Sequence, residues 1–188
     1  MNSKDHNHNV IERILPFEMI RSMSVDEDMS IEDFRKQFST EEVCAEALFK
    51  AKWPNGYQCP RCSCTYMTKI TSRRLPLYEC SSCYYQASLL TGTVMERSKT
   101  DLRKWFTALF LFSQKNGQIN ASQLKSEIEV TYKTAWLILT KIRTAVSQAD
   151  DQTKLSGHVR INPGIYRNKI HATATRHPQE QILLVGAT

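Results

Sequence analysis

The chain has 188 residues, of which 41% are hydrophobic and 23% charged, and its net charge is +6. This length suits one ordinary domain or two to three small ones, and this composition excludes a chain that is disordered throughout. No apolar run is long enough to span a bilayer, so we expect no membrane partner. The polar start, MNSKDHNHN, lacks the apolar region of a signal peptide, which predicts a cytoplasmic protein with reduced thiols.

Charge is distributed unevenly along the chain. Residues 1–50 carry 6 basic and 11 acidic side chains, whereas residues 51–188 carry 19 and 8. A basic body favours a polyanionic partner, although ordinary solubilising charge is the alternative interpretation. Residues 1–30 show no firm hydrophobic period, and we interpret them as a flexible acidic tail.

The next segment, residues 31–56, is predicted to form the N-terminal helices. A short helix is expected over 31–38. Ser39 and Glu42 then have the spacing of a capping box, which predicts a second helix to about Lys52. The residues expected on its buried face are Val43, Ala47 and Leu48.

Residues 57–92 change in character and contain the sequence runs of a small antiparallel sheet. Three short β-prone runs cover residues 66–70, 77–79 and 84–88. A sheet of this size cannot bury a core of its own, so we expect another interaction to stabilise it.

Two cysteine pairs lie within this segment and predict a zinc site. Cys59 and Cys62 form one C-x2-C motif, Cys80 and Cys83 form a second, and 17 residues separate the pairs. A hairpin of this length brings the pairs together, and four thiolates at about 2.3 Å from one ion complete a closed tetrahedron. The cofactor that we expect is therefore structural Zn²⁺.

Other interpretations of these cysteines were weighed. A disulfide framework requires an oxidising compartment, a redox-active pair requires one C-x2-C motif near a βαβ pattern, and an iron–sulfur cluster can also use four cysteines. We interpret Cys64 as a free thiol beside the site and Cys44 as a buried helix residue.

Helical periodicity returns over residues 100–148. Apolar residues at helical spacing predict a helix that begins after Asp101 and stops at Gly117. Asn120, with Gln123 at the position that reaches back, predicts the cap of a second helix, and Thr131 predicts the cap of a third that ends near residue 146.

The last two of these helices fit a helix-turn-helix DNA-binding unit. In that design the N-terminal residues of the second helix contact base edges, so we predict that Lys133 and Thr134 read bases and that Lys141 and Arg143 contact phosphates. A plain three-helix bundle with a solvated lysine face is the alternative. Glu129 also stands in the turn where a glycine often eases the bend.

The order of these motifs resembles the zinc-ribbon insertion-sequence transposases of bacteria. The resemblance spans about residues 36–161, and the motifs that carry it are CPRC, CSSC, LLTGT (89–93), LRKWF (102–106), YKTAW (132–136) and KIR (141–143). It implies zinc on the four paired cysteines, DNA contact by the helices at 120–146, and a following RNase H-like nuclease domain with an acidic triad. The fold class that we expect is α+β, with a zinc-ribbon sheet followed by a three-helix unit.

The resemblance fails where the nuclease chemistry should begin. The family has Asp and Glu after the run at 155–161, but this chain has Asn162 and Pro163, and its one later acidic residue is Glu180. Neutral side chains are poor Mg²⁺ ligands. We therefore expect residues 155–188, with strands at 159–161, 170–174 and 181–185, to be an incomplete start of the RNase H-like domain, with no catalytic residues in this chain.

We therefore expect a truncated transposase that binds double-stranded DNA at transposon ends and is nucleoid-associated. The protein partners that this interpretation allows are a second copy of the chain or an intact transposase. Three alternatives stay open: a zinc-dependent transcriptional regulator, a zinc-ribbon module for protein interaction, and an active transposase.

Overall fold

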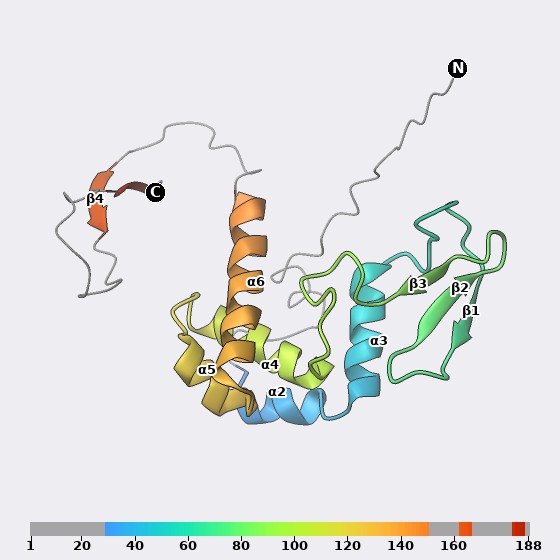
Figure 1. Cartoon of the computed structure of the whole chain (residues 1–188), viewed down its shortest axis with the longest axis horizontal. Coiled ribbons are helices and arrows are strands. Elements are labelled where there is room, and N and C mark those ends of the chain that lie inside the picture. The colour runs from blue at the N-terminus through green and yellow to red at the C-terminus, as the bar shows by residue number, and fades with distance from the viewer. Residues whose placement is uncertain (1–28, 151–161, 167–181, 187–188) are drawn as a thin grey trace, which may run out of the picture. The chain divides into compact units, whose positions relative to one another are not determined.

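The computed structural model of the protein describes residues 29–150, 162–166 and 182–186. Residues up to Asp150 belong to one unit and later residues to a second. The first unit contains the helices α2 (Ile31–Gln37), α3 (Glu41–Lys52), α4 (Leu102–Gln114), α5 (Ala121–Ile128) and α6 (Tyr132–Asp150), and the strands β1 (Met67–Ile70), β2 (Leu77–Cys80) and β3 (Gln86–Ser88). Figure 1 shows α3 between the sheet and the other helices.

The two N-terminal helices form as expected, but the second is capped and oriented differently. The cap predicted at Ser39 is wrong by one residue, because the Thr40 side chain accepts a hydrogen bond from the Val43 amide at 3.3 Å. Of the residues predicted on the buried face, Leu48 is buried and Ala47 is half-buried, but Val43 is 39% exposed, so the prediction is wrong for Val43. The buried residues of α3 are Cys44, Ala45 and Leu48.

The small sheet has the antiparallel order β1-β2-β3, with Met67 opposite Cys80 and Tyr78 opposite Ala87. Tyr78, Cys80 and Ala87 are buried. The Tyr78 ring lies 4.7 Å from that of Phe49 and 5.5 Å from that of Trp53 at the end of α3. The sheet therefore packs one face on an aromatic cluster and does not stand alone.

Helix α4 is the centre of the helical part, since residues all around it are buried. It packs on α2 through Phe34 and Phe110, whose rings stack at 4.3 Å, and through Phe38 and Phe106 at 5.2 Å. Full burial of one such ring is worth about 1.5–3 kcal/mol.

The helix starts predicted in this region are confirmed. Asp101 caps α4, Asn120 and Gln123 form a reciprocal capping box at α5, and Thr131 accepts a hydrogen bond from the Thr134 amide at 3.2 Å. The third helix is longer than predicted and runs to Asp150.

Two side chains that the sequence did not single out join the sheet to the helices. The Lys52 ammonium donates to the carbonyls of Ser88 at 2.7 Å, Leu89 at 3.4 Å and Thr91 at 2.6 Å. Burial lowers the pKa of Lys52 to about 8, against the opposing charge of Glu96. These bonds tie the end of α3 to the segment that leaves the sheet.

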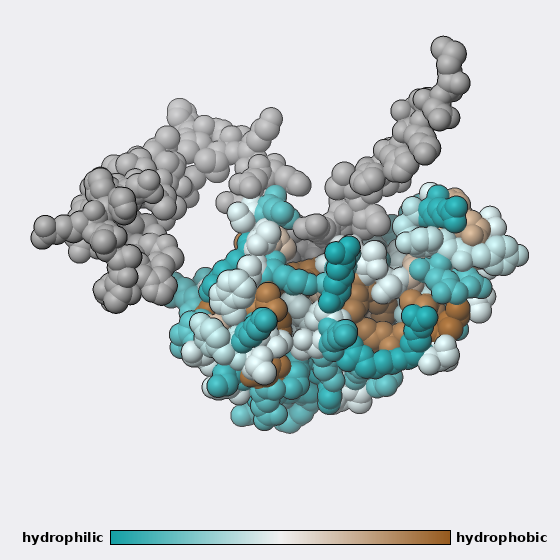
Figure 2. Space-filling view, viewed as in Figure 1, coloured by the Kyte–Doolittle hydropathy of each residue, from teal (hydrophilic) through white to brown (hydrophobic). Residues whose placement is uncertain are grey.

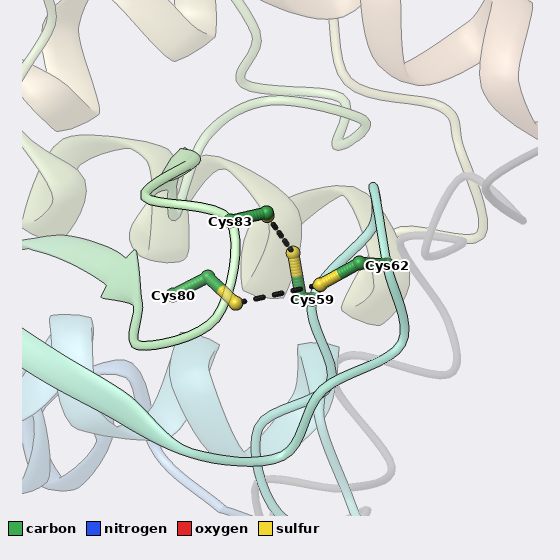
Figure 3. A group of neighbouring side chains, drawn as sticks. All are labelled: Cys59, Cys62, Cys80 and Cys83. Atoms are coloured by element: carbon green, nitrogen blue, oxygen red, sulfur yellow. Dashed lines mark hydrogen bonds between the residues drawn. The ribbon is translucent and has the colours of Figure 1, made fainter.

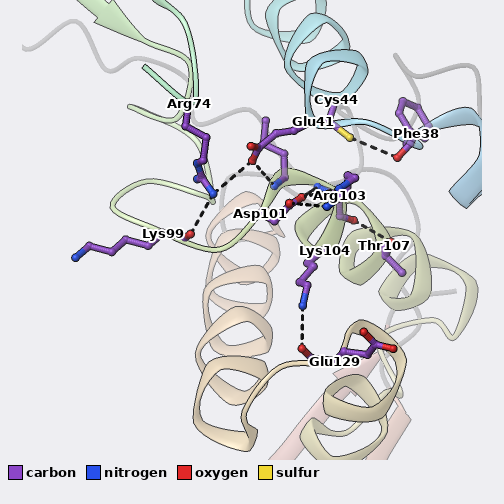
Figure 4. Close-up of polar contacts among 11 residues, drawn as sticks. Phe38, Glu41, Cys44, Arg74, Lys99, Asp101, Arg103, Lys104, Thr107 and Glu129 are labelled. Carbon is purple, nitrogen blue, oxygen red and sulfur yellow. Dashed lines mark hydrogen bonds and ion pairs between the residues drawn. The ribbon is translucent and has the colours of Figure 1, made fainter. Parts of the chain in front are cut away.

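The second link is Glu41, at the start of α3. Its carboxylate accepts from the Leu102 amide at 3.1 Å and pairs with Arg74 at 3.5 Å, and Arg74 also donates to the Lys99 carbonyl (Figure 4). The carboxylate accepts a hydrogen bond from an amide that has no partner within α4 itself. Its negative charge also interacts favourably with the positive end of the helix dipole.

The second unit contains β4 (Asn162–Tyr166) and β5 (Ile182–Gly186), which pair antiparallel. The strand expected at 181–185 is confirmed with a shift of one residue. The dipeptide Pro163-Gly164, which is typical of a turn, lies instead within β4, opposite Val185 and Leu184. Proline is tolerated at the edge of a sheet. The expected tail over residues 1–28 and the strands expected at 159–161 and 170–174 lie outside the described residues.

Among the described residues, no helix combines the length and the apolar character that crossing a membrane requires.

The turn between α5 and α6 yields a stability prediction. Glu129 caps α5 in the left-handed conformation, with φ 50° and ψ 57°, where a side chain is disfavoured. We expect Glu129→Gly to raise the free energy of unfolding by about 0.5–1 kcal/mol, measured by urea denaturation. The control is Lys125→Gly within α5, which should lower it by a similar amount. Destabilisation by Glu129→Gly would contradict the role of this conformation.

Candidate metal centre and nucleic-acid interface

The four paired cysteines converge at one end of the small sheet. Cys59 and Cys62 lie in the turn before β1, Cys80 ends β2 and Cys83 lies in the turn that follows, so two separate turns face each other (Figure 3). Their four sulfur atoms all lie within 4.8 Å of one another. Cys59 Sγ lies 3.6 Å from Cys83 Sγ, and Cys62 Sγ lies 3.5 Å from Cys80 Sγ.

These separations fit a single tetrahedral ion. Four sulfurs at about 2.3 Å from Zn²⁺ are about 3.8 Å apart, whereas a disulfide requires about 2.05 Å. All six cysteines of the chain are free. A cluster of several iron ions would hold its ligands farther apart than one ion does, so the geometry favours zinc. Four thiolates fill the coordination sphere, which makes the site structural.

The two cysteine pairs lie in two separate backbone turns of the same kind. The Ser63 amide donates to the Cys59 carbonyl at 2.9 Å and the Tyr84 amide to the Cys80 carbonyl at 3.0 Å. Ser63 and Tyr84 both adopt positive φ, at 59° and 56°. The two turns therefore present their sulfurs in the same way.

Backbone amides favour the thiolate form of Cys59 and Cys80, whereas hydrogen bonds with the neighbouring thiols raise the pKa of Cys62. The Arg61 amide donates to Cys59 Sγ at 3.4 Å. The Cys83 amide lowers the pKa of the Cys80 thiol to about 6, against the effect of burial, and the Ser82 amide adds to it. Metals bind the thiolate form, so a lowered pKa favours ligation at neutral pH.

Tyr57 lies beside the site with an unusual hydroxyl. The hydroxyl is buried and makes no hydrogen bond among the described residues. Burial, followed by the neighbouring Cys59 side chain, raises the pKa of Tyr57. The phenol therefore keeps its proton and can donate to the Cys59 thiolate. Outer-shell donors of this kind support metal ligands in many sites.

The two remaining cysteines stay outside the metal group. Cys64 is half-buried and contributes its carbonyl to the first turn, where it accepts from the Cys59 amide. Cys44 is fully buried in α3, as predicted.

The structure does not bring the four residues expected to contact DNA into one site. Lys133 is exposed in the first turn of α6, and Thr134 places its hydroxyl 2.9 Å from that of Thr131. Lys141 donates to the Glu96 carbonyl and its ammonium lies 5.9 Å from the centre of the Trp105 ring. Arg143 donates to the Ile119 carbonyl at 2.8 Å. The last two cations therefore serve the packing of α6, and all four DNA contacts stay predictions.

One exposed feature of α6 was missed by the sequence analysis. Tyr132 and Trp136 point away from the core together with Leu137. The helical period of the sequence indicates this exposure, because Trp136 and Leu137 fall on the side of the helix opposite the buried Ile138 and Leu139.

Comparison with known proteins relates this geometry to transposable elements. Residues 39–86, which hold α3 and the four metal-site cysteines, match the family model of the transposase zinc-ribbon domain. A protein described as an uncharacterized protein in transposable element ISH50, from Halobacterium salinarum, is 37% identical over 102 residues. That match covers 54% of this chain and 34% of the relative, so the chain spans about a third of the relative's length. No solved structure matches the chain.

These findings relate residues 39–86 of the chain to the zinc-ribbon domain of transposases. The mixed helices, the small antiparallel sheet and the cysteine cluster agree with a zinc ribbon. The expected zinc cofactor therefore has support from both sequence similarity and geometry.

The cysteine geometry predicts which thiols the metal requires. We expect about one zinc ion per chain and loss of that ion in Cys80→Ser, which removes a buried ligand with a lowered pKa. The matched control is Cys64→Ser, which should keep full zinc content. Metal analysis of the purified proteins and the Co²⁺ charge-transfer spectrum measure this. Equal zinc loss in both variants would contradict the four-cysteine site.

Tyr57 gives a second prediction at this site. Removing its hydroxyl in Tyr57→Phe leaves the ring packing but removes a donor to Cys59, so we expect zinc affinity to fall by about tenfold. Competition with a chromogenic chelator measures the affinity. Tyr66→Phe, on a ring that is 76% exposed, is the control and should have no effect. An unchanged affinity in Tyr57→Phe would show that only its ring matters.

Proposed function

We propose that this chain is the DNA-binding part of an insertion-sequence transposase and that it recognises transposon-end DNA. The observation that carries the proposal is the match of residues 39–86 to the transposase zinc-ribbon domain, in the segment where the four cysteine sulfurs lie within 4.8 Å of one another. The basic balance of residues 51–188 is consistent with a DNA partner.

In this proposal α5 and α6 act as a helix-turn-helix. Three residues, Glu129 to Thr131, join the helices, and capping by Thr131 fixes where α6 begins. Lys104 donates to the Glu129 carbonyl at 2.8 Å and so holds the turn against α4 (Figure 4). The first turn of α6 then presents Lys133 to base edges in the major groove.

The zinc ribbon has a positioning role. The residues that would hold Zn²⁺ are Cys59, Cys62, Cys80 and Cys83, and the ion supplies a fixed cross-link when it is bound. The sheet that it organises is tied to α3 and α4 through Lys52 and Glu41. We infer that the ribbon sets the orientation of the helical unit on DNA.

The proposal includes no strand cleavage by this chain. Asn162 and Pro163 occupy the positions where the resembling transposases carry carboxylates, and both lie in β4. We propose that the chain occupies transposon ends, alone or together with an intact transposase. A transcriptional regulator built from the same modules would instead prefer its own upstream region.

A duplex-binding experiment tests the function. We expect affinity for a fluorescent duplex to fall steeply between about 50 and 200 mM salt, because phosphate contacts release counterions. For duplexes recovered from a randomised pool, Lys133→Gln should reduce the preference over random DNA by about 1–3 kcal/mol.

The matched control is Lys36→Gln in α2, whose side chain is 78% exposed and pairs with Asp33. It should bind like the unmodified protein. Absence of duplex binding at low salt would overturn the proposal, and a preference for the upstream region over the element's ends would favour the regulator.

A further inference from the structure

The first half of α6 exposes three large hydrophobic side chains. Tyr132 is 54% exposed, Trp136 51% and Leu137 46%. They are half of the six large hydrophobic residues that are exposed in the described part of the chain. Tyr132 and Trp136 are four residues apart and therefore lie side by side on the helix surface, and Leu137 lies farther around the same exposed side.

These residues are not needed for the core of the first unit. The opposite face of α6 is already buried, and its residues are Ala135, Ile138, Leu139, Ile142 and Ala145. Helix α6 uses that face to pack on α5 and α4. Exposed aromatic and aliphatic side chains that cluster in this way mark an interaction surface.

The surroundings of the three side chains identify the kind of partner. Residues 132–149 include Lys133, Lys141 and Arg143 but no acidic residue. Exposed hydroxyls of Thr140 and Thr144 continue the same face. In the view of Figure 2, hydrophobic and hydrophilic residues are mixed over the end of the unit formed by α5 and α6. This segment of α6 combines Lys133, hydroxyls and apolar groups and has no acidic residue of its own, a composition that suits a DNA groove.

The chemistry of the major groove supplies a matching apolar group. It admits an α-helix, and thymine presents its C5-methyl there, which side chains recognise by apolar contact. We propose that Tyr132, Trp136 and Leu137 read thymines through these methyl groups. This inference rests on the proposed function and adds a class of base contact to it.

The geometry limits how many base pairs the three residues can read. Residues 132 to 137 span about 7.5 Å along the helix, at about 1.5 Å per residue. That length corresponds to about two base-pair steps of about 3.4 Å each. The bound site should therefore carry thymines within two or three adjacent base pairs, next to the base contacted by Lys133.

Trp136 provides a direct measurement of this contact. The chain has three tryptophans, and Trp53 and Trp105 are only 9% and 1% exposed. Quenching by acrylamide therefore reports mainly on Trp136. We expect a duplex recovered from a randomised pool to protect the Trp136 fluorescence from acrylamide when it binds. In Trp136→Phe, binding of the same duplex should leave acrylamide quenching unchanged. Unchanged quenching in a saturated complex would overturn the inference.

A chemical change in the DNA tests the methyl contact itself. Replacing thymine by deoxyuridine in the recovered duplex removes only the methyl groups. We expect affinity to fall about fourfold per contacted methyl, from the transfer free energy of one such group. Trp136→Ala and Leu137→Ala should each lose the part of this difference that the removed side chain contributes. The matched control is Tyr66→Ala, at a ring that is 76% exposed, which should keep the full difference.

The outcomes separate this inference from the proposed function. A protein that binds no duplex at any salt concentration overturns both. Selective duplex binding that is insensitive to deoxyuridine, Trp136→Ala and Leu137→Ala overturns only the thymine contact. A dimer that Trp136→Ala dissociates in sedimentation, with DNA binding unchanged, assigns the face to a second copy of the chain and also overturns it. Circular dichroism establishes that each variant is folded.

Discussion

The convergence of two thiol pairs on one point is the constraint on which the small sheet depends. Its strands contain only three or four residues each, and their ladders alone cannot stabilise it. A structural zinc ion bound by four cysteines is worth on the order of 10 kcal/mol, which exceeds what one buried ring such as Tyr78 contributes. An ion bound there would therefore contribute most to forming the sheet, and the aromatic packing on α3 places the sheet against that helix.

The sheet and the helices are linked by polar contacts as well as by packing. Glu41 contacts both Arg74 of the sheet region and the first amide of α4, and Lys52 holds the chain where it leaves β3. Each of these charged groups has several partners. Its hydrogen bonds are stronger than those between neutral groups because one partner is ionised. Glu41 and Lys52 thus connect the sheet region to α3 and α4.

The sequence predicted the features that local spacing determines. The two C-x2-C motifs located the metal site, and the capping residues Asp101, Asn120 and Thr131 located the helix starts. The errors arise where contacts between residues far apart in the sequence determine which side chains are buried or hydrogen-bonded. The side of α3 that is buried is set by packing on α4, so Val43 faces solvent. Lys52 and Glu41 bond to residues 36 to 61 positions away, which no local pattern reveals. Lys141 looked like a surface lysine for the same reason, although it contacts Glu96.

The partners of Lys141 and Arg143 change how α6 could recognise a ligand. Because carbonyls of Glu96 and Ile119 accept hydrogen bonds from these cations, phosphate contacts there would compete with bonds that hold the fold together. In the first half of the helix, three of the exposed side chains, Tyr132, Trp136 and Leu137, are large and hydrophobic. Apolar groups distinguish one base from another but add little long-range attraction. Attraction to a polyanion would then come from the basic body as a whole, and selectivity from a short segment of one helix.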